Sequence, residues 1–208
     1  ILGGTNLGLI DINNTANFNA NVTATTIEVI DAKVATFKDD VTATSIALDA
    51  TSNFTTAVAS SAADTTITGT IDGIAANEGI ITVNNTSQLT TFASAIGATR
   101  AIEDINVDQN VVFNSTVDTV GGNIATGKSA TFKGDTTIGA DELVIVGTAN
   151  ISGTAAQTIS GVISGDGSGA GKLDIVNTAG TVTFDTALGA TADDILAEIE
   201  ASENSTVV

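Results

Sequence analysis

Short stretches of the chain alternate between apolar and polar residues, which is the pattern of a β-strand with one buried face. In residues 35–38, the alanine and the phenylalanine point one way while the threonine and the lysine point the other. Each stretch is bounded by Gly, Asn, Asp, Ser or Thr, which favour turns. The pattern predicts many short strands joined by tight turns. Similar alternation occurs at Ile46 with Leu48, Ile81 with Val83, Leu173 with Ile175, and Val182 with Phe184.

The phenylalanines are spaced at the length of one β-helix coil. The spacing is 19 from Phe18 to Phe37 and 17 from Phe37 to Phe54, and it is 19 for each step from Phe113 through Phe132 to Ile151. Equivalent residues of stacked coils lie about 4.8 Å apart along the axis, so these side chains would form continuous interior stacks. We therefore predict an all-β fold, a parallel β-helix.

A longer repeat of 92 to 95 residues covers the chain. The block Ala-Ile-Gly-Ala-Thr at 95–99 returns 92 residues later, at 187–191, as Ala-Leu-Gly-Ala-Thr, and residues 1–5 match it 94 residues earlier. The pair Phe18-Asn19 returns as Phe113-Asn114 at an offset of 95. Such self-similarity is typical of solenoid proteins.

This repeat divides the chain into one unit at 1–95, a second at 96–187, and the start of a divergent third at 188–208. A unit of about five coils would rise on the order of 24 Å, and two units would form a rod of roughly 50 Å. In the third unit, residues 192–202 have an acidic start and apolar spacing that allow a short helix within a segment otherwise expected to contain strand.

Tandem β-sandwich domains are the alternative fold, because 92 to 95 residues is also a normal length for an immunoglobulin-like domain. Against this alternative, the chain has no Trp or Tyr core marker and no Pro-rich linker. A string of sandwiches would also leave the shorter spacing of the phenylalanines unexplained. We therefore favour the β-helix.

The composition excludes most chemistry. Among the 208 residues, 42% are hydrophobic, and there is no Pro, Cys, Met, Trp, Tyr or His. Without His and Cys, the chain has no imidazole base, no thiolate nucleophile and no ordinary zinc site. We predict that it is not an enzyme.

The charge excludes two classes of partner. Six Lys and Arg against 24 Asp and Glu give a formal charge of −18, which repels nucleic acid and anionic membranes. No apolar stretch approaches the length of about 20 residues that a membrane helix needs, so we expect no direct membrane insertion. The chain begins at Ile1 without a basic n-region, and we expect it to be an interior or mature segment whose signal and anchor lie outside it.

Carboxylates are the only side chains that could hold a metal. Calcium favours oxygen-rich turns, and it is the only cofactor that the sequence suggests. The EF-hand spacing and the Gly-Asp nonapeptide of calcium β-rolls are both absent, so solvated surface carboxylates are the plainer interpretation. The glycine-rich segment 165–171 lacks the end of a phosphate-binding loop and is predicted to be a turn between coils. The candidate calcium ligands are Asp39, Asp40, Asp166, Asp193 and Asp194.

Two stretches resemble a known class of bacterial protein. Residues 182–191, and the stretch from 95–99 through 105–107 to 113–117, resemble the repeats of autotransporter passenger domains and of rickettsial-type outer-surface antigens. The likeness covers nearly the whole chain and identifies a broad class. It implies a right-handed β-helix on the outside of a Gram-negative cell, used in adhesion or as a surface coat. This class has no shared catalytic residues to carry over.

The expected function is that of a structural repeat segment in a secreted bacterial surface protein, such as a coat, stalk, filament or S-layer element. Neighbouring copies of the chain are the expected partners, and the bacterial cell surface is the expected location. An adhesin passenger that binds a host or cell receptor, or a segment of a phage fibre, is the alternative.

Overall fold

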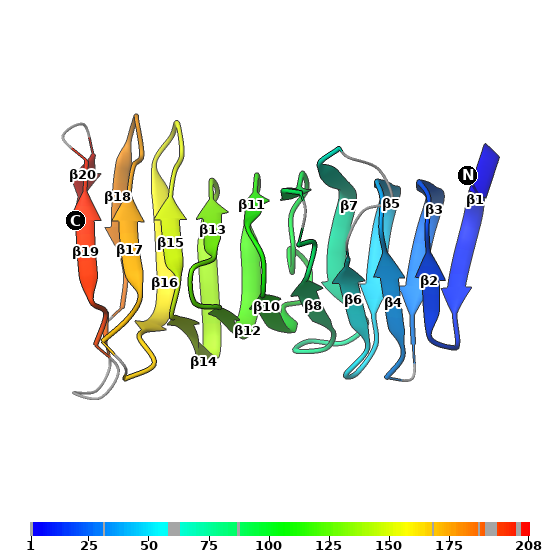
Figure 1. Cartoon of the computed structure of the whole chain (residues 1–208), viewed down its shortest axis with the longest axis horizontal. Helices are drawn as coiled ribbons and strands as arrows, with labels where there is room; N and C mark the ends of the chain where they lie inside the picture. Colours follow the sequence, from blue (N-terminus) through cyan, green and yellow to red (C-terminus); the bar gives the residue numbers. More distant parts are fainter. Residues whose placement is uncertain are drawn as a thin grey trace.

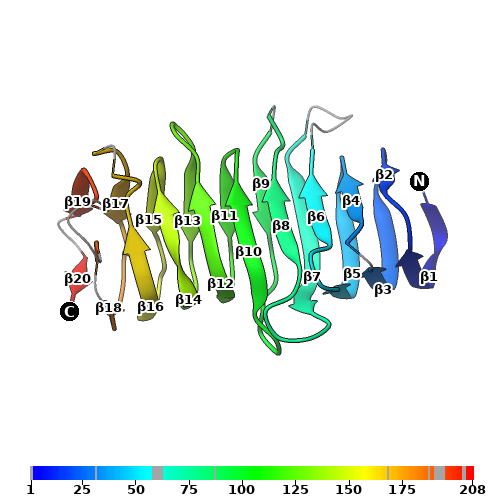
Figure 2. The ribbon, with the colours of Figure 1, turned by 90° about the horizontal axis from the view of Figure 1, so that it is seen from below.

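A computed structural model describes residues 2–30, 32–57, 63–86, 88–167, 169–186, 188–189, 195–202 and 205–208, with the side chains of residues 2–6 left out. The described chain is an elongated stack of strands with its two termini at opposite ends (Figure 1). Seen from below, the strands again lie side by side along one axis (Figure 2). The described part of the chain has no helix that could cross a membrane.

The strands form two ten-stranded sheets, each joining every second strand of the chain. The odd-numbered sheet contains β1 Leu2–Ile12, β3 Val22–Val29, β5 Val41–Leu48, β7 Thr65–Gly73, β9 Thr90–Phe92, β11 Val111–Phe113, β13 Ser129–Phe132, β15 Thr148–Ile151, β17 Lys172–Ile175 and β19 Glu198–Ala201. The even-numbered sheet contains β2 Ala16–Phe18, β4 Val34–Phe37, β6 Asn53–Thr56, β8 Ile80–Val83, β10 Ile102–Val107, β12 Val117–Ile124, β14 Thr136–Ile145, β16 Gln157–Ser164, β18 Thr181–Phe184 and β20 Thr206–Val207.

All pairs of neighbouring strands are parallel, as in β1 with β3 and β2 with β4. A strand followed by its parallel neighbour one coil later is the defining connection of a parallel β-helix. The predicted fold is therefore confirmed. The sandwich alternative is wrong, because an immunoglobulin-like sandwich is built from antiparallel strands and would interrupt the sheets between domains.

The solenoid consists of about nine stacked coils. Columns of paired residues run along it and define three faces. The long strands, such as β5 and β14, bend and so cover more than one face. Face A runs through Val22, Val41, Ile67, Phe92, Phe113, Phe132, Ile151, Ile175 and Ala201; face B through Ile27, Ile46, Ile71, Ile96, Val117, Thr136, Ile159 and Phe184; face C through Ala16, Ala35, Phe54, Ile81, Ile105, Gly122, Leu143, Ile163 and Leu188.

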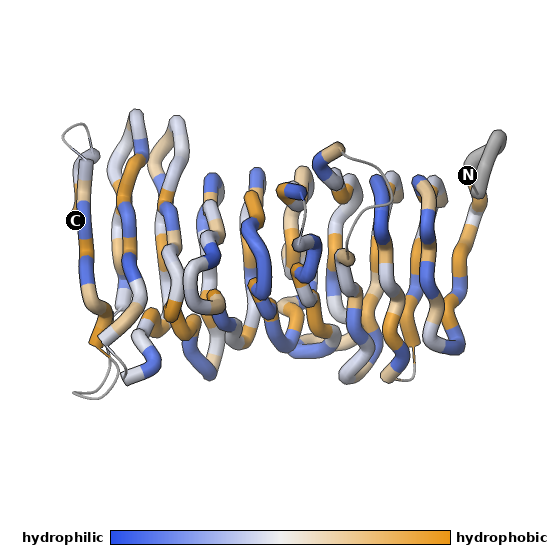
Figure 3. The backbone as a smooth tube through the Cα atoms, in the orientation of Figure 1, coloured by the Kyte–Doolittle hydropathy of each residue, from blue (hydrophilic) through white to orange (hydrophobic). Residues whose placement is uncertain are grey.

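Alternation along each strand places the apolar residues in the core. In β4, β6, β8, β13, β15 and β17 the second and fourth residues are buried, while the first and third are partly exposed. Figure 3 shows this as hydrophobic segments alternating with hydrophilic ones along the tube. The narrow set of Ile, Val, Leu, Phe and Ala in these positions forms one continuous core along the axis.

A ladder of six phenylalanine rings runs inside the core. Phe18 stacks on Phe37 at a centroid distance of 4.8 Å, and Phe37 stacks on Phe54 at 4.6 Å. In the second half, Phe92, Phe113 and Phe132 stack at 5.4 and 5.1 Å. Between the two halves, Phe54 and Phe92 are 6.4 Å apart and tilted by 58°. The ladder changes face at this tilted step, because Phe54 lies on face C and Phe92 on face A.

The spacing of 17 between Phe37 and Phe54 has a local cause. Phe37 pairs with Thr56, while Phe54 pairs with Ala35, so Phe54 lies two positions before the one that continues the column of Phe37. Its ring nevertheless stacks on that of Phe37. The coil itself is no shorter here, because the step from Phe37 to Thr56 equals the step from Phe18 to Phe37.

One repeat of 92 to 95 residues covers four complete coils and then one further face of the next coil, so equivalent residues of two successive units lie on adjacent faces. From Ile67, four rungs along face A lead to Ile151, and the repeat partner Ile159 lies on the next face, B. The expectation of about five coils per unit was therefore slightly too high. The repeated block follows the same rule: Leu2 pairs on face A, Ile96 on face B and Leu188 on face C.

The short helix allowed within 192–202 is not found in the described residues of that segment. Residues 198–201 form strand β19, which pairs in parallel with β17. Pairing with the preceding coil offers the backbone a full set of inter-strand hydrogen bonds, which outweighs the weak helical spacing of a few apolar residues.

Candidate functional site

Carboxylates at the corners of the solenoid accept hydrogen bonds from the coil that follows. Asp40 lies just before β5, and its Oδ1 accepts a hydrogen bond from the backbone amide of Thr66 at 2.8 Å. Asp135 lies just before β14 and accepts from the amide of Thr158, also at 2.8 Å. Asp40 and Asp135 are repeat partners at an offset of 95, so both units use the same contact, which precedes face A in the first unit and face B in the second. Related contacts join Asp64 to Leu89, Asp72 to Thr99 and Arg100, and Asn110 to Ser129.

The structure does not gather the candidate calcium ligands into a metal site within the residues it describes. Asp39 Oδ1 accepts a hydrogen bond from the amide of Asp40 at 3.3 Å, and Asp40 is used by Thr66. Asp166 is exposed in the turn between β16 and β17, where a turn was predicted. Asp193 and Asp194 lie outside the described residues. No group of three or more acidic side chains in the described ranges is placed to hold a metal, and calcium stays a prediction.

The role of Asp40 can be separated from calcium binding by two substitutions. We expect Asp40→Ala to lower the free energy of unfolding by about 1 to 2 kcal/mol, because the amide of Thr66 would lose its acceptor. Asp40→Asn keeps an acceptor oxygen and should cost less than about 0.5 kcal/mol. Urea unfolding of both variants, with and without calcium, measures this. A calcium-dependent loss of stability in Asp40→Asn would contradict a purely structural role.

A cluster of acidic side chains around a hollow lies on the outer surface of face C. A depression of about 420 Å³ is bordered by Glu103 and Asp104 of β10 and by Asp141 and Glu142 of β14. Its floor is Gly121 and Gly122 of β12. Because glycine has no side chain, β12 projects no side chains at Gly121 and Gly122 between the acidic residues of β10 and β14, and this leaves the hollow.

The glycines of this floor are required by the close approach of neighbouring strands. A Cβ on Gly122 would lie 2.7 Å from the carbonyl oxygen of Ile105, and one on Gly121 would lie 3.0 Å from the Cβ of Asp141. The register between β12 and β14 shifts just here, between the pairs of Thr119 and of Gly122. Residues 139–142 of β14 therefore lie opposite only residues 120–121 of β12, and Asp141 and Glu142 stand in this irregular part of the strand beside the depression.

Asp104 is a partly buried carboxylate of the depression. Burial raises the pKa of Asp104, and the negative charge of Asp141 raises it further, while hydrogen bonds from Asn106 and the Ile105 amide partly oppose the rise. Asn106 donates to Asp104 Oδ2 at 2.9 Å, and Asn123 donates in turn to Asn106. The site can therefore present a polar, negatively charged surface to solvent.

We expect Asp104→Asn to stabilise the chain at neutral pH, by roughly 0.5 kcal/mol after solvent screening. The folded state binds the Asp104 proton more tightly than the unfolded state, because its pKa is raised. The wild-type penalty is therefore full above the raised pKa and disappears as pH falls to the ordinary aspartate range. Urea unfolding at pH 7 and pH 3.5 measures this, with the exposed Asp11→Asn as control. A stabilisation equal at both pH values would contradict the assignment.

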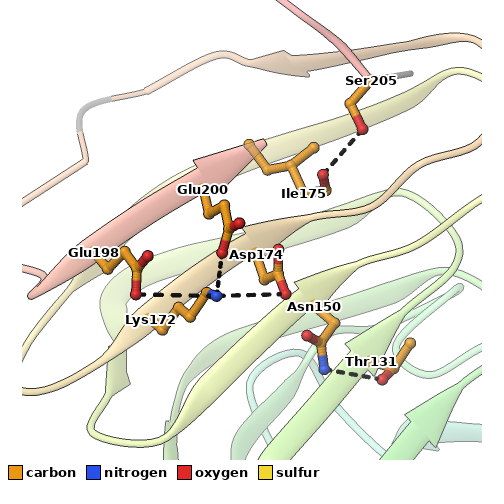
Figure 4. A network of polar contacts seen from close by, with 8 residues as sticks. All are labelled: Thr131, Asn150, Lys172, Asp174, Ile175, Glu198, Glu200 and Ser205. Carbon is orange, nitrogen blue, oxygen red and sulfur yellow. Dashed lines mark hydrogen bonds and ion pairs between the residues drawn. The ribbon is translucent and has the colours of Figure 1, made fainter. Parts of the chain in front are cut away.

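A second polar network lies on the outer surface of face A near the C-terminal end (Figure 4). Lys172 of β17 pairs with Asp174 at 3.8 Å, with Glu198 at 3.9 Å and with Glu200. The contact with Glu200 raises the pKa of Lys172. These are the ion pairs among the residues that the structure describes, and they fasten β19 to β17 at the surface. Exposed pairs of this kind add little stability, typically below about 1 kcal/mol.

The sequence alone did not single out the acidic depression. One carboxylate pair stands at 103–104 and the other at 141–142, and they meet only because β10 and β14 flank β12. The signal that could have found the depression is the Gly-Gly pair at 121–122 inside an otherwise regular strand, which is typical of a bulge or of a close backbone approach. Placing this pair opposite the acidic residues needs the exact length of each coil.

The fold defines the class: a parallel β-helix repeat protein with a continuous apolar core and an acidic, Thr- and Asn-rich surface. Comparison with protein-family models, with curated proteins and with solved structures found no match to this chain.

Proposed function

We propose that the chain is a structural segment of a secreted bacterial surface protein, in which a β-helical rod provides length and stiffness at the cell surface. The observation that carries this proposal is the continuous core. Each of the three faces is filled mainly by apolar side chains through successive coils, and six phenylalanine rings run along the axis.

The surface and the composition support the same function. The rod has no His or Cys, and its Asp corners are used to fasten one coil to the next. A chain without Cys can be exported unfolded without forming wrong disulfides. We therefore propose that this segment has no catalytic role and that it is exposed on the outside of the cell.

Labelling of intact cells tests the location. Antibodies raised against the purified segment should bind unpermeabilised cells of the source organism, and the signal should be lost after brief digestion of those cells with a protease. An antibody against a cytoplasmic enzyme is the control for cell integrity. Binding that needs permeabilised cells would overturn the surface location.

The mechanical part of the proposal is tested separately on the purified segment. Electron microscopy and small-angle X-ray scattering should find a stiff rod about 45 Å long, as expected for about nine stacked coils. Proteinase K should leave the rod intact for much longer than it leaves a urea-unfolded sample. Rapid digestion together with a compact, rounded scattering profile would contradict a rod-like spacer.

A further inference from the structure

Two pairs of lysines flank equivalent short strands in the two repeat units. Lys33 and Lys38 flank β4, and Lys128 and Lys133 flank β13. We call each pair, together with the strand between its two lysines, a lysine corner: the first contains β4 and the second contains β13. Together they hold four of the six basic residues of the chain.

The backbone around the two corners is built in the same way. In both, the backbone amide of the first lysine donates a hydrogen bond to the carbonyl of the residue three positions earlier, which forms a turn. The carbonyl of the same lysine accepts a hydrogen bond from a backbone amide of the following coil, and the amide of the second lysine donates to a carbonyl of the preceding coil. The matching hydrogen bonds are Lys33 to Ile30 (3.2 Å) and Lys128 to Ala125 (3.0 Å), Asn53 to Lys33 and Thr148 to Lys128 (both 2.8 Å), and Lys38 to Phe18 and Lys133 to Phe113 (both 3.0 Å).

The two corners point in different directions. Strand β4 carries Ala35 and belongs to face C, whereas β13 carries Phe132 and belongs to face A. This follows from a repeat of four coils and one additional face. Equivalent surface residues of the two repeat units therefore lie on different faces of the rod, and do not form one line along it. A single straight ligand on one side cannot contact both corners.

Lys133 is exposed, and Lys33, Lys38 and Lys128 are partly exposed, so each corner lysine has surface open to solvent. The ion pairs among the described residues all belong to Lys172, so the corner lysines form none with those residues. Lys128 donates one hydrogen bond to Gln109, at 2.7 Å. The chain has 24 carboxylates for six basic groups, so the surface of another copy offers acidic partners in excess.

We propose that the lysine corners are the surfaces through which one copy of the chain contacts carboxylates on neighbouring copies, in two different directions. This inference rests on the proposed structural function and adds how the rods associate. A charge of −18 repels copies at low ionic strength, but at about 0.15 M salt this repulsion is screened beyond about 8 Å. Direct lysine–carboxylate contacts are shorter than that and persist.

Sedimentation velocity across a concentration series in about 0.15 M salt tests the proposal. Three variants are compared with wild type: Lys33→Gln with Lys38→Gln, Lys128→Gln with Lys133→Gln, and all four together. The control matched to the two-site variants is Arg100→Gln with Lys172→Gln, which also removes two positive charges, but at positions away from the corners. Circular dichroism and thermal unfolding of each variant establish that it remains folded.

We expect wild type and control to form species larger than dimers as concentration rises. Each two-site variant should weaken association at least tenfold and form smaller species, and the four-site variant should stay monomeric. The proposal is overturned if wild type stays a single rod at every concentration, if corner variants associate like the control, or if one corner alone accounts for all association. A folded, protease-resistant single rod would leave the proposed structural function intact.

Discussion

Replacing Phe37 by alanine is expected to lower the free energy of unfolding by about 4 kcal/mol. Phe37 is fully buried, and its ring lies between those of Phe18 and Phe54. The substitution removes a large apolar side chain, leaves a cavity that neighbouring coils cannot fill without moving, and ends two stacking contacts. Urea unfolding followed by far-ultraviolet circular dichroism measures the loss.

Phe184→Ala provides a matched control. Phe184 is only partly buried, near the C-terminal end of face B, and stands apart from the six-ring ladder. Its loss should cost about 1 to 2 kcal/mol, the ordinary value for partial burial of an aromatic side chain. Equal losses in the two variants would contradict the large cost assigned to full burial within the ladder.

The second large effect is expected at Gly97, within the repeated block. Gly97 has a φ of +71°, and a Cβ there would lie 2.1 Å from the carbonyl oxygen of Asp118 in the next coil. Alanine would meet both an unfavourable backbone conformation and a clash with backbone that cannot move without parting two coils. We expect Gly97→Ala to cost about 3 kcal/mol or more.

Gly127 separates these two causes. Its φ is +69°, nearly the same as that of Gly97, but a Cβ there would have no atom within 4 Å. Gly127→Ala should therefore cost only the strain of the left-handed conformation, about 1 to 2 kcal/mol. Thermal unfolding of both variants measures the difference. If Gly127→Ala proves as costly as Gly97→Ala, backbone conformation and not the contact with Asp118 is the cause.

Local alternation and the phenylalanine spacing were enough to predict the fold. Strands such as β4 and β13 are short and strictly alternating, and this pattern, repeated at coil length, suits a solenoid better than a sandwich. What alternation cannot give is the length of each coil. The coil from Val41 to its partner Ile67 is markedly longer than the coil from Val22 to its partner Val41. Loops set these lengths, and the composition of a loop does not predict which residues of the next coil will pair with those of the previous one.

This explains which parts of the candidate site the sequence missed. The acidic residues at 39–40 were adjacent in the chain and therefore conspicuous, but the structure uses Asp40 to hold the next coil. The pairs at 103–104 and 141–142 were inconspicuous, and they meet across Gly121 and Gly122. Proximity in a solenoid depends on coil register, whereas sequence motifs report only neighbours along the chain.

Pairing between adjacent coils alone has a consequence for how such a chain acquires its structure. Each strand in the interior of a sheet bonds to the strand one coil before it and to the strand one coil after it. A newly formed coil thus needs only its predecessor as a template, and each loop to be closed is short. The chain can therefore fold progressively from one end to the other, with each completed coil serving as the edge on which the next one forms.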